Sequence, residues 1–167
     1  MTRPFLSHSG RAVSLPLDNV DTDVIIPMQQ LLSVPRGELG RYAFNALRYD
    51  QEGQERPDFP MNMPNGRGAS VIVAGRNFGC GSSREGAVYA LVGLNIASVI
   101  ASSYGDIFFS NCMKNGVLPI LLSQPEVERI HAAMSASSEP VNISIDLENQ
   151  MIAFSTGLQL SFEIDAE

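Results

Sequence analysis

The sequence has no excess of basic residues and no long apolar run. Among its 167 residues, 18 acidic side chains outnumber 11 basic ones, which gives a formal net charge of −7. An acidic chain without a basic stripe is poorly suited to a phosphate backbone, so we expect no nucleic-acid partner. Residues 1–10 lack the apolar core of a signal peptide, and no segment approaches the length of a membrane span. We therefore expect a cytoplasmic protein without a membrane partner.

The scarcity of thiols and imidazoles limits the metal chemistry of the chain. It contains two cysteines and two histidines, namely Cys80, Cys112, His8 and His131. An iron–sulfur cluster usually needs three or four thiolates, so we do not expect this chain to hold one by itself. No Cys-x-x-Cys pair indicates zinc, and we expect no metal ligand. Cys80 is either a small residue in a crowded turn or a thiol made reactive by a positive local field.

The composition that is present fits one globular domain. Hydrophobic residues make up 44% of the chain and charged residues 17%, which is typical of a folded protein. A chain of this length can bury a core without metal or disulfide crosslinks. No internal repeat or low-complexity tract divides it, so we predict a single domain over residues 1–167.

The most informative segment is residues 75–86, which read GRNFGCGSSREG directly after a short apolar run. This pattern predicts a strand, a glycine-rich turn and a helix. Ser82 lies three residues before Glu85, the spacing of a capping box at a helix N-terminus. A helix N-terminus with Arg84 beside it attracts anions. We therefore predict a carboxylate or phosphate site, with Ser82 and Ser83 at the point of contact.

The same turn also occurs in α/β proteins that bind nothing there, so a purely structural role stays open. Two nucleotide fingerprints can be tested. A phosphate-binding loop that starts at Gly75 fails because its sixth residue is Cys80 and not glycine. A dinucleotide fingerprint that starts at Gly79 fails because Arg84 stands where its third glycine belongs. These failures exclude both nucleotide sites.

The first half of the chain is less regular. Residues 11–17 alternate loosely and predict a strand, and two acids around a threonine within residues 20–27 indicate a turn or a helix cap. A short helix is expected over 29–34, where Pro35 ends it. Residues 36–67 are long for a loop inside a compact domain, which favours a mobile flap or an insertion, with one helical turn at 41–44.

The second half alternates between short apolar runs and amphipathic stretches. The expected strands are 71–74, 96–101 and 117–122, and the expected helices are 84–92, 103–114 and 125–136. Strands separated by helices favour parallel pairing with crossover helices. From residue 141 onward, apolar and polar residues alternate, as in half-buried antiparallel strands. We therefore predict one α/β domain with a mixed sheet flanked by helices.

Four motifs occur in the order and spacing of a known family. They are NVDTDVIIP at 19–27, NFGCGSSRE at 77–85, DIFFSNC at 106–112 and KNGVLPI at 114–120. Over nearly its whole length the chain resembles the small subunits of 3-isopropylmalate dehydratase, which are swivelling domains of the aconitase superfamily. The resemblance implies a single swivelling-type β/β/α domain.

The resemblance also implies a reaction and a division of labour. It implies a hydro-lyase of leucine biosynthesis, a branch of branched-chain amino-acid synthesis, that isomerises 2-isopropylmalate to 3-isopropylmalate. Such a chain is active only with a large subunit, as a heterodimer or heterotetramer, and that partner carries the [4Fe-4S] cluster. This chain would bind no cofactor and would contribute the residues that face a small dicarboxylate. By their matching positions, Ser82 would be the catalytic base, Ser83 and Arg84 would hold a carboxylate, and Asp23 would line the side of the site that faces the cluster.

The chain departs from the family pattern at four positions. Gly86 stands where the family usually has His, Met28 where it has Lys, Gln30 where it has an aromatic residue, and Leu47 where it has Trp. These changes leave the residues for proton transfer intact but leave the substrate open. One alternative is a sister hydro-lyase for a methylmalate, citraconate or dimethylmaleate type of substrate. Another is a non-catalytic module that binds an anion.

The segment after the first motif bears on the substrate's side chain. Relatives that act on tricarboxylates resemble this segment but carry an arginine near position 32, whereas residues 31–34 here are apolar. An apolar surface prefers a branched hydrocarbon group to a buried, unpaired carboxylate, so we predict that Leu32 contacts the substrate. The alternative is that Leu31 and Leu32 pack into the core, and Arg36 or Arg41 could also reach the site.

Overall fold

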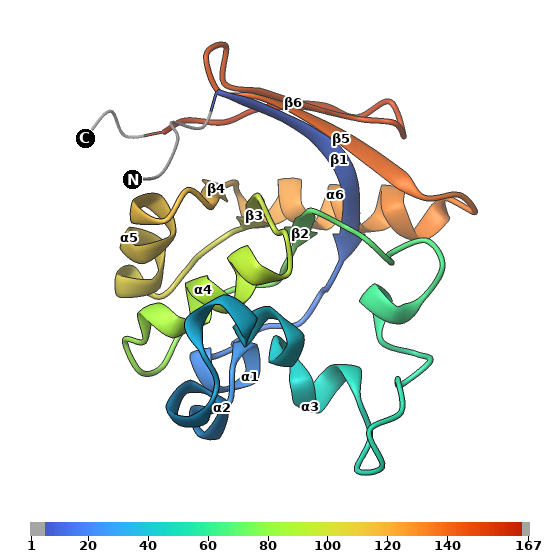
Figure 1. Ribbon diagram of the computed structural model, residues 1–167. Helices are drawn as coiled ribbons and strands as arrows, with labels where there is room; N and C mark the ends of the chain where they lie inside the picture. The colour runs from blue at the N-terminus through green and yellow to red at the C-terminus, as the bar shows by residue number, and fades with distance from the viewer. Residues whose placement is uncertain (1–5, 165–167) are drawn as a thin grey trace.

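The computed structural model describes residues 6–164, and within them one mixed sheet forms the frame of the molecule (Figure 1). Its spatial order is β4-β3-β2-β1-β5-β6-β7. The strands are β1 (Ser7–Ser14), β2 (Val71–Val73), β3 (Ser98–Ala101), β4 (Leu118–Leu121), β5 (Val141–Asp146), β6 (Met151–Phe154) and β7 (Gln159–Ser161). Strands β1 to β4 pair in parallel, whereas β5 pairs antiparallel with β1 and leads into the antiparallel β6 and β7.

Helices cover both faces of this sheet. They are α1 (Thr22–Ile25), α2 (Met28–Ser33), α3 (Asn45–Arg48), α4 (Glu85–Gly93), α5 (Asp106–Lys114) and α6 (Gln124–Ala136), with the 3₁₀ helices η1 (Arg36–Tyr42) and η2 (Pro60–Asn62). Alternate residues of β1 point to opposite faces: Val13 joins the core under α4 and α5, and Ala12 joins the core under α6. The shorter helices α1 to α3 gather beside α4 (Figure 1).

The predicted mixed sheet and its parallel β2-β3-β4 region are confirmed, but two boundaries are wrong. The first strand covers residues 7–14 and not 11–17. It begins earlier because residues 7–12 pair with the whole of β5. The helix predicted from residue 103 begins at Asp106, because the preceding residues pair with the glycine-rich turn. There the Phe78 N–H donates to the Ser103 carbonyl over 3.1 Å.

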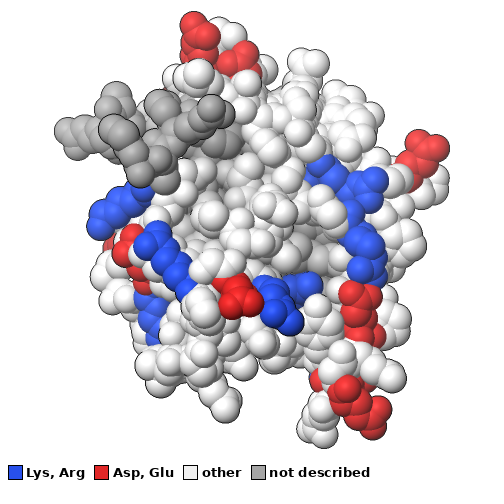
Figure 2. Space-filling model, in the orientation of Figure 1, with Lys and Arg blue, Asp and Glu red and all other residues white. Residues whose placement is uncertain are grey.

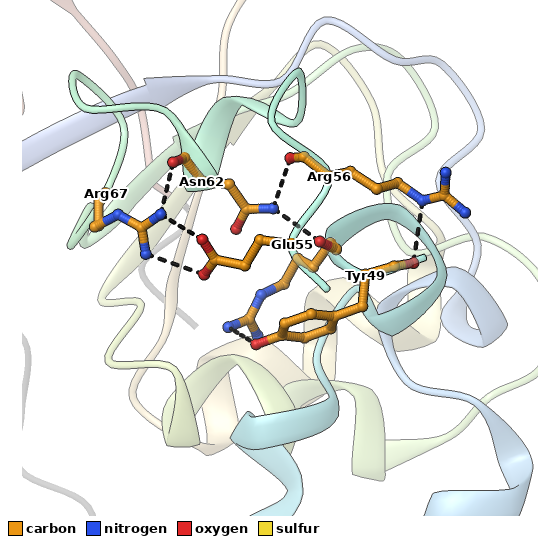
Figure 3. A network of polar contacts seen from close by, with 6 residues as sticks. Tyr49, Glu55, Arg56, Asn62 and Arg67 are labelled. Carbon is orange, nitrogen blue, oxygen red and sulfur yellow. Dashed lines mark hydrogen bonds and ion pairs between the residues drawn. The ribbon is translucent and has the colours of Figure 1, made fainter. Parts of the chain in front are cut away.

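Side chains and main-chain carbonyls hold residues 36–67 together where regular structure is sparse (Figure 3). Arg67 donates to both carboxylate oxygens of Glu55, at 2.6 and 3.1 Å. The amide nitrogen of Asn62 donates to the carbonyls of Arg48 and Arg56, at 2.8 and 3.0 Å. Of the single helical turn expected at 41–44, Arg41 and Tyr42 end the helix η1, and residues 43 and 44 form a turn before α3. The motion expected of this segment stays a prediction.

Helix α6 is fastened to the sheet through a histidine. The Nε2 of His131 lies 2.9 Å from the Ala74 carbonyl, which can only accept a hydrogen bond. Nδ1 is then the unprotonated nitrogen, and it accepts from the Ser14 hydroxyl at 2.6 Å. His131 is therefore half-buried rather than on the surface of its helix, and this burial lowers its pKa.

Candidate active site

The glycine-rich turn leaves the carboxyl end of β2 and crosses the start of α5. Gly79 has a φ of +75°, and a Cβ on it would lie 2.2 Å from the ring of Phe108. Both conditions require glycine. The rings of Phe78 and Phe108 pack edge to face, with their centroids 5.5 Å apart. The turn and the first turn of α5 are therefore locked together.

The segment before α1 pairs with the same turn from its other side. The Gly79 N–H donates to the Val20 carbonyl at 2.7 Å, and the Thr22 N–H donates to the Cys80 carbonyl at 2.9 Å. The buried Thr22 hydroxyl donates to the Ser82 carbonyl at 2.9 Å. Thr22 thus fixes the main chain at Ser82. The sequence assigned it no role, although it stands between the two acids of the first motif.

The predicted capping box at Ser82 and Glu85 is wrong. Helix α4 has Arg84 as its N-cap residue, and no side chain within residues 6–164 caps it. The Arg84 N–H donates to the Ser82 carbonyl at 2.9 Å, a tight bend that keeps Ser82 outside the helix. The Glu85 carboxylate instead accepts from the Asn115 side chain at 2.9 Å, and this hydrogen bond lowers the pKa of Glu85.

The chain brings Ser82, Ser83, Arg84 and Asp23 to one place. Both serines are exposed, and the Arg84 side chain is 18% exposed. Arg84 Nη1 forms an ion pair with Asp23 Oδ1, and within the described residues no other partner takes its remaining guanidinium nitrogens. Asp21 acts as the expected cap of α1, since its carboxylate accepts from the Val24 N–H at 2.8 Å.

A hollow of about 240 Å³ separates these residues from the start of α5. Ser82, Ser83 and Arg84 line one side, and residues 105–108 line the other. Ile107, for which the sequence pattern predicted no function, lines the hollow and is 54% exposed. The hollow therefore combines hydroxyl groups, a guanidinium and the N-terminus of α5, which suit a small carboxylate, with the acidic Asp106 on its opposite side.

The two leucines of the apolar segment 31–34 lie in different environments. Leu31 packs against the core, as the alternative reading proposed, but Leu32 is 82% exposed and does not line the hollow. The two arginines that could have reached the site are engaged elsewhere. The guanidinium carbon of Arg36 lies 3.6 Å from the centre of the Tyr89 ring, and Arg41 lies 3.4 Å from a carboxylate oxygen of Glu38.

The described residues add few other candidate functional features. Within residues 6–164, no three His, Cys, Asp or Glu side chains lie together as a possible metal site. No helix in that range combines the length and apolarity needed to cross a bilayer. Figure 2 shows acidic side chains close to basic ones on the face that it displays, and the short run of basic side chains at its right edge ends beside acidic ones.

Comparison with known proteins gives consistent matches. The model of the aconitase C-terminal domain matches residues 2–125. The 3-isopropylmalate dehydratase small subunit of Dinoroseobacter shibae is 48% identical over 164 residues, which is 97% of this chain and 80% of that protein. The protein of the same name from a Jannaschia species is 48% identical over 162 residues, with the same coverage. A crystal structure of 3-isopropylmalate dehydratase (LeuD) from Methanocaldococcus jannaschii superposes with a TM-score of 0.71 at 31% identity, and covers 97% of this chain and 84% of that one.

Proposed function

This chain belongs to the aconitase C-terminal domain family, and we propose that it is the small subunit of a hydro-lyase that isomerises 2-isopropylmalate to 3-isopropylmalate. Relatives with 48% identity over the aligned residues carry the name of that small subunit. The observation that carries the proposal is the exposed Ser82 beside Arg84 at an uncapped helix N-terminus. Its product would serve leucine biosynthesis.

Ser82 is the proposed base. During dehydration, its oxyanion takes a proton from a substrate carbon while the hydroxyl on the neighbouring carbon leaves, and rehydration reverses these steps at exchanged positions. A free serine hydroxyl ionises far too weakly for this role, so its oxyanion needs positive potential nearby. Arg84 and the N-terminal end of α4 supply that potential. The Thr22 hydroxyl fixes the adjacent carbonyl and so limits the positions open to the Ser82 side chain.

Arg84 and Ser83 are proposed to hold a carboxylate of the substrate. The ion pair with Asp23 engages one guanidinium nitrogen and so orients the others. Asp23 is thus proposed to act partly through Arg84, while it also lines the side that faces the partner. Leu32 is proposed to meet the branched hydrocarbon group once the substrate is bound.

The partner is proposed to be a large subunit that holds a [4Fe-4S] cluster, because the two cysteines of this chain are too few to ligate one. When bound there, the cluster supplies a Lewis acid for the departing hydroxyl. The pair assembles as a heterodimer or a heterotetramer. We propose that the domain swivels against this partner and that residues 36–67 move as a flap.

A second candidate is a sister hydro-lyase for another small substituted malate, which the departures from the family pattern at Gly86, Met28, Gln30 and Leu47 leave open. Co-expression with a large subunit of a 3-isopropylmalate dehydratase, followed by assays on several substituted malates, tests both. We expect the highest kcat/KM for 2-isopropylmalate. Highest turnover of a methylmalate would favour the sister enzyme. An absence of turnover with every malate, together with binding of simple dicarboxylates by the chain alone, would favour a non-catalytic module.

A further inference from the structure

Gly86 lies in the first turn of α4, and space rather than backbone conformation explains why it is glycine. Its φ is not in the left-handed region, so any L residue could adopt its backbone. A Cβ at this position, however, would lie 2.1 Å from Cδ2 and 3.3 Å from Cγ of Leu31. The side chain of Leu31 therefore occupies the volume that a residue at position 86 would fill.

Helix α2 contacts the core through Leu31 and through Val34, its C-cap residue. Helix α2 contains no fully buried residue, and three of its six residues flank Leu31 as exposed or half-exposed polar groups. Leu31 itself packs against the core formed with α4, whereas its neighbour Leu32 is 82% exposed. The contact between Leu31 and Gly86 is thus a close approach between α2 and α4, and α2 also packs against η1.

The two segments joined by this contact carry different parts of the candidate site. Ser83 and Arg84 immediately precede the first turn of α4, where Gly86 lies. Leu32 follows Leu31 on α2. Leu32 does not line the hollow itself, so α2 could affect the site only through its position relative to α4.

We infer that Gly86 forms a socket for Leu31, and that this socket positions α2 so that it sets the width of the pocket for the substrate's side chain. The first part rests only on the packing of the chain, and the second rests on the proposed function. Leu31 and Gly86 are positioning residues, since neither touches the reacting atoms. The absence of a side chain at position 86 is then a matched feature of two helices and not a loss.

The variant Gly86→Ala distinguishes displacement of Leu31 from a change in the helix propensity of α4 alone. Alanine is a better helix former than glycine, so Gly86→Ala would stabilise α4 if the socket were unimportant. With the socket, the added Cβ displaces Leu31 and loosens α2. Gly37→Ala is the matched control, because no described atom lies within 4 Å of the position of its Cβ and its φ is not left-handed.

Hydrogen exchange over residues 28–33 of the full chain is the direct measurement. We expect about tenfold faster exchange in Gly86→Ala and in Leu31→Ala, and no change in Gly37→Ala. Because Gly86→Ala and Leu31→Ala break the same contact, the double variant should exchange no faster than either single variant. Unchanged exchange in Gly86→Ala, or additive effects in the double variant, would overturn the socket.

The substrate half of the inference is tested in the complex with the large subunit. Gly86→Ala should raise the KM for 2-isopropylmalate by about five- to tenfold and change the KM for 2-methylmalate by less than twofold, with kcat nearly constant. Equal changes for both substrates would overturn the effect on pocket width. If the wild-type complex turned over no malate, the proposed function would fail, while the exchange measurements would still decide whether the socket exists.

Discussion

Helices α4 and α6 both follow the pattern Ser-x-x-Glu, but only α6 uses it as a cap. At α6, Ser123 Oγ accepts from the Glu126 N–H at 3.3 Å, and Glu126 Oε1 accepts from the Ser123 N–H at 3.1 Å. At α4, Ser82 stays outside the helix and exposed. Helix α6 satisfies amide groups of its first turn with its own side chains, whereas α4 has no side-chain cap, as the proposed carboxylate site requires.

The cause of this difference lies in the chain before each helix. Ser123 has extended backbone angles, which let its side chain fold back onto the first turn. Ser82 follows Gly81, whose φ is +93°, and its carbonyl accepts from both Thr22 and Arg84. These contacts turn the serine out of the capping position. The same local sequence pattern therefore adopts two different conformations.

The largest expected effect comes from removing the hydroxyl that α4 does not use as a cap. Ser82→Ala should lower kcat by about 10²–10⁴-fold, because the proposed base is lost. Its free energy of unfolding should change by less than about 0.5 kcal/mol, because no cap is lost. Steady-state kinetics of the complex and urea denaturation of the chain measure the two quantities. Near-normal turnover would remove Ser82 from the mechanism.

The next effect concerns the guanidinium at the same helix end. Arg84→Lys should raise KM by about tenfold or more, because a point charge replaces a planar fork that can bind a carboxylate with two hydrogen bonds. Arg67→Lys is the matched control, since it also breaks a fork, with Glu55, but outside the hollow. An unchanged KM in Arg84→Lys would contradict a carboxylate contact there.

The third prediction concerns Ser123, which caps α6. Ser123→Ala should lower the free energy of unfolding by about 1 kcal/mol, because it breaks the capping box of α6. The kcat of the complex should stay within about twofold of the wild type, because Ser123 lies outside the hollow. Equal stability losses in Ser82→Ala and Ser123→Ala would show that both serines cap, and would end the contrast between the two helices.

The smallest effect is one of pH on the anchoring of α6. Burial lowers the pKa of His131 from its ordinary value of 6.5, although its hydrogen bond with Ala74 opposes this shift. The unfolded chain then binds protons at a higher pH than the folded chain, so stability is complete above about pH 6.5 and falls as the pH drops through the folded pKa. Hydrogen exchange, corrected for intrinsic rates, should accelerate in α6 before α4 between pH 7 and 5.

A substitution isolates this contribution of His131. Burial lowers the pKa of His8 in the same direction, so some acid sensitivity remains without His131. The variant His131→Gln should show a smaller dependence of stability on pH over that range. An identical dependence in the variant and the wild type would assign the effect to other groups.

Much of the fold follows from local patterns in the sequence. Apolar runs marked β2, β3 and β4, and alternation marked the late antiparallel strands, because burial on one or two faces imposes those periods. The motif around Ser82 identified the correct turn. The sequence failed where distant segments compete for the same groups, as at the start of α5 and at the false capping box of α4.

The amino-acid order by itself determined the succession of helices and strands, the glycine-rich turn and the family, since each depends on neighbours along the chain. Tertiary structure alone decided that Asp23 meets Arg84, that Thr22 holds Ser82 in place, and which serine caps its helix. These outcomes depend on contacts between segments about 60 residues apart, which local sequence patterns do not encode and which the packing of the folded chain brings together.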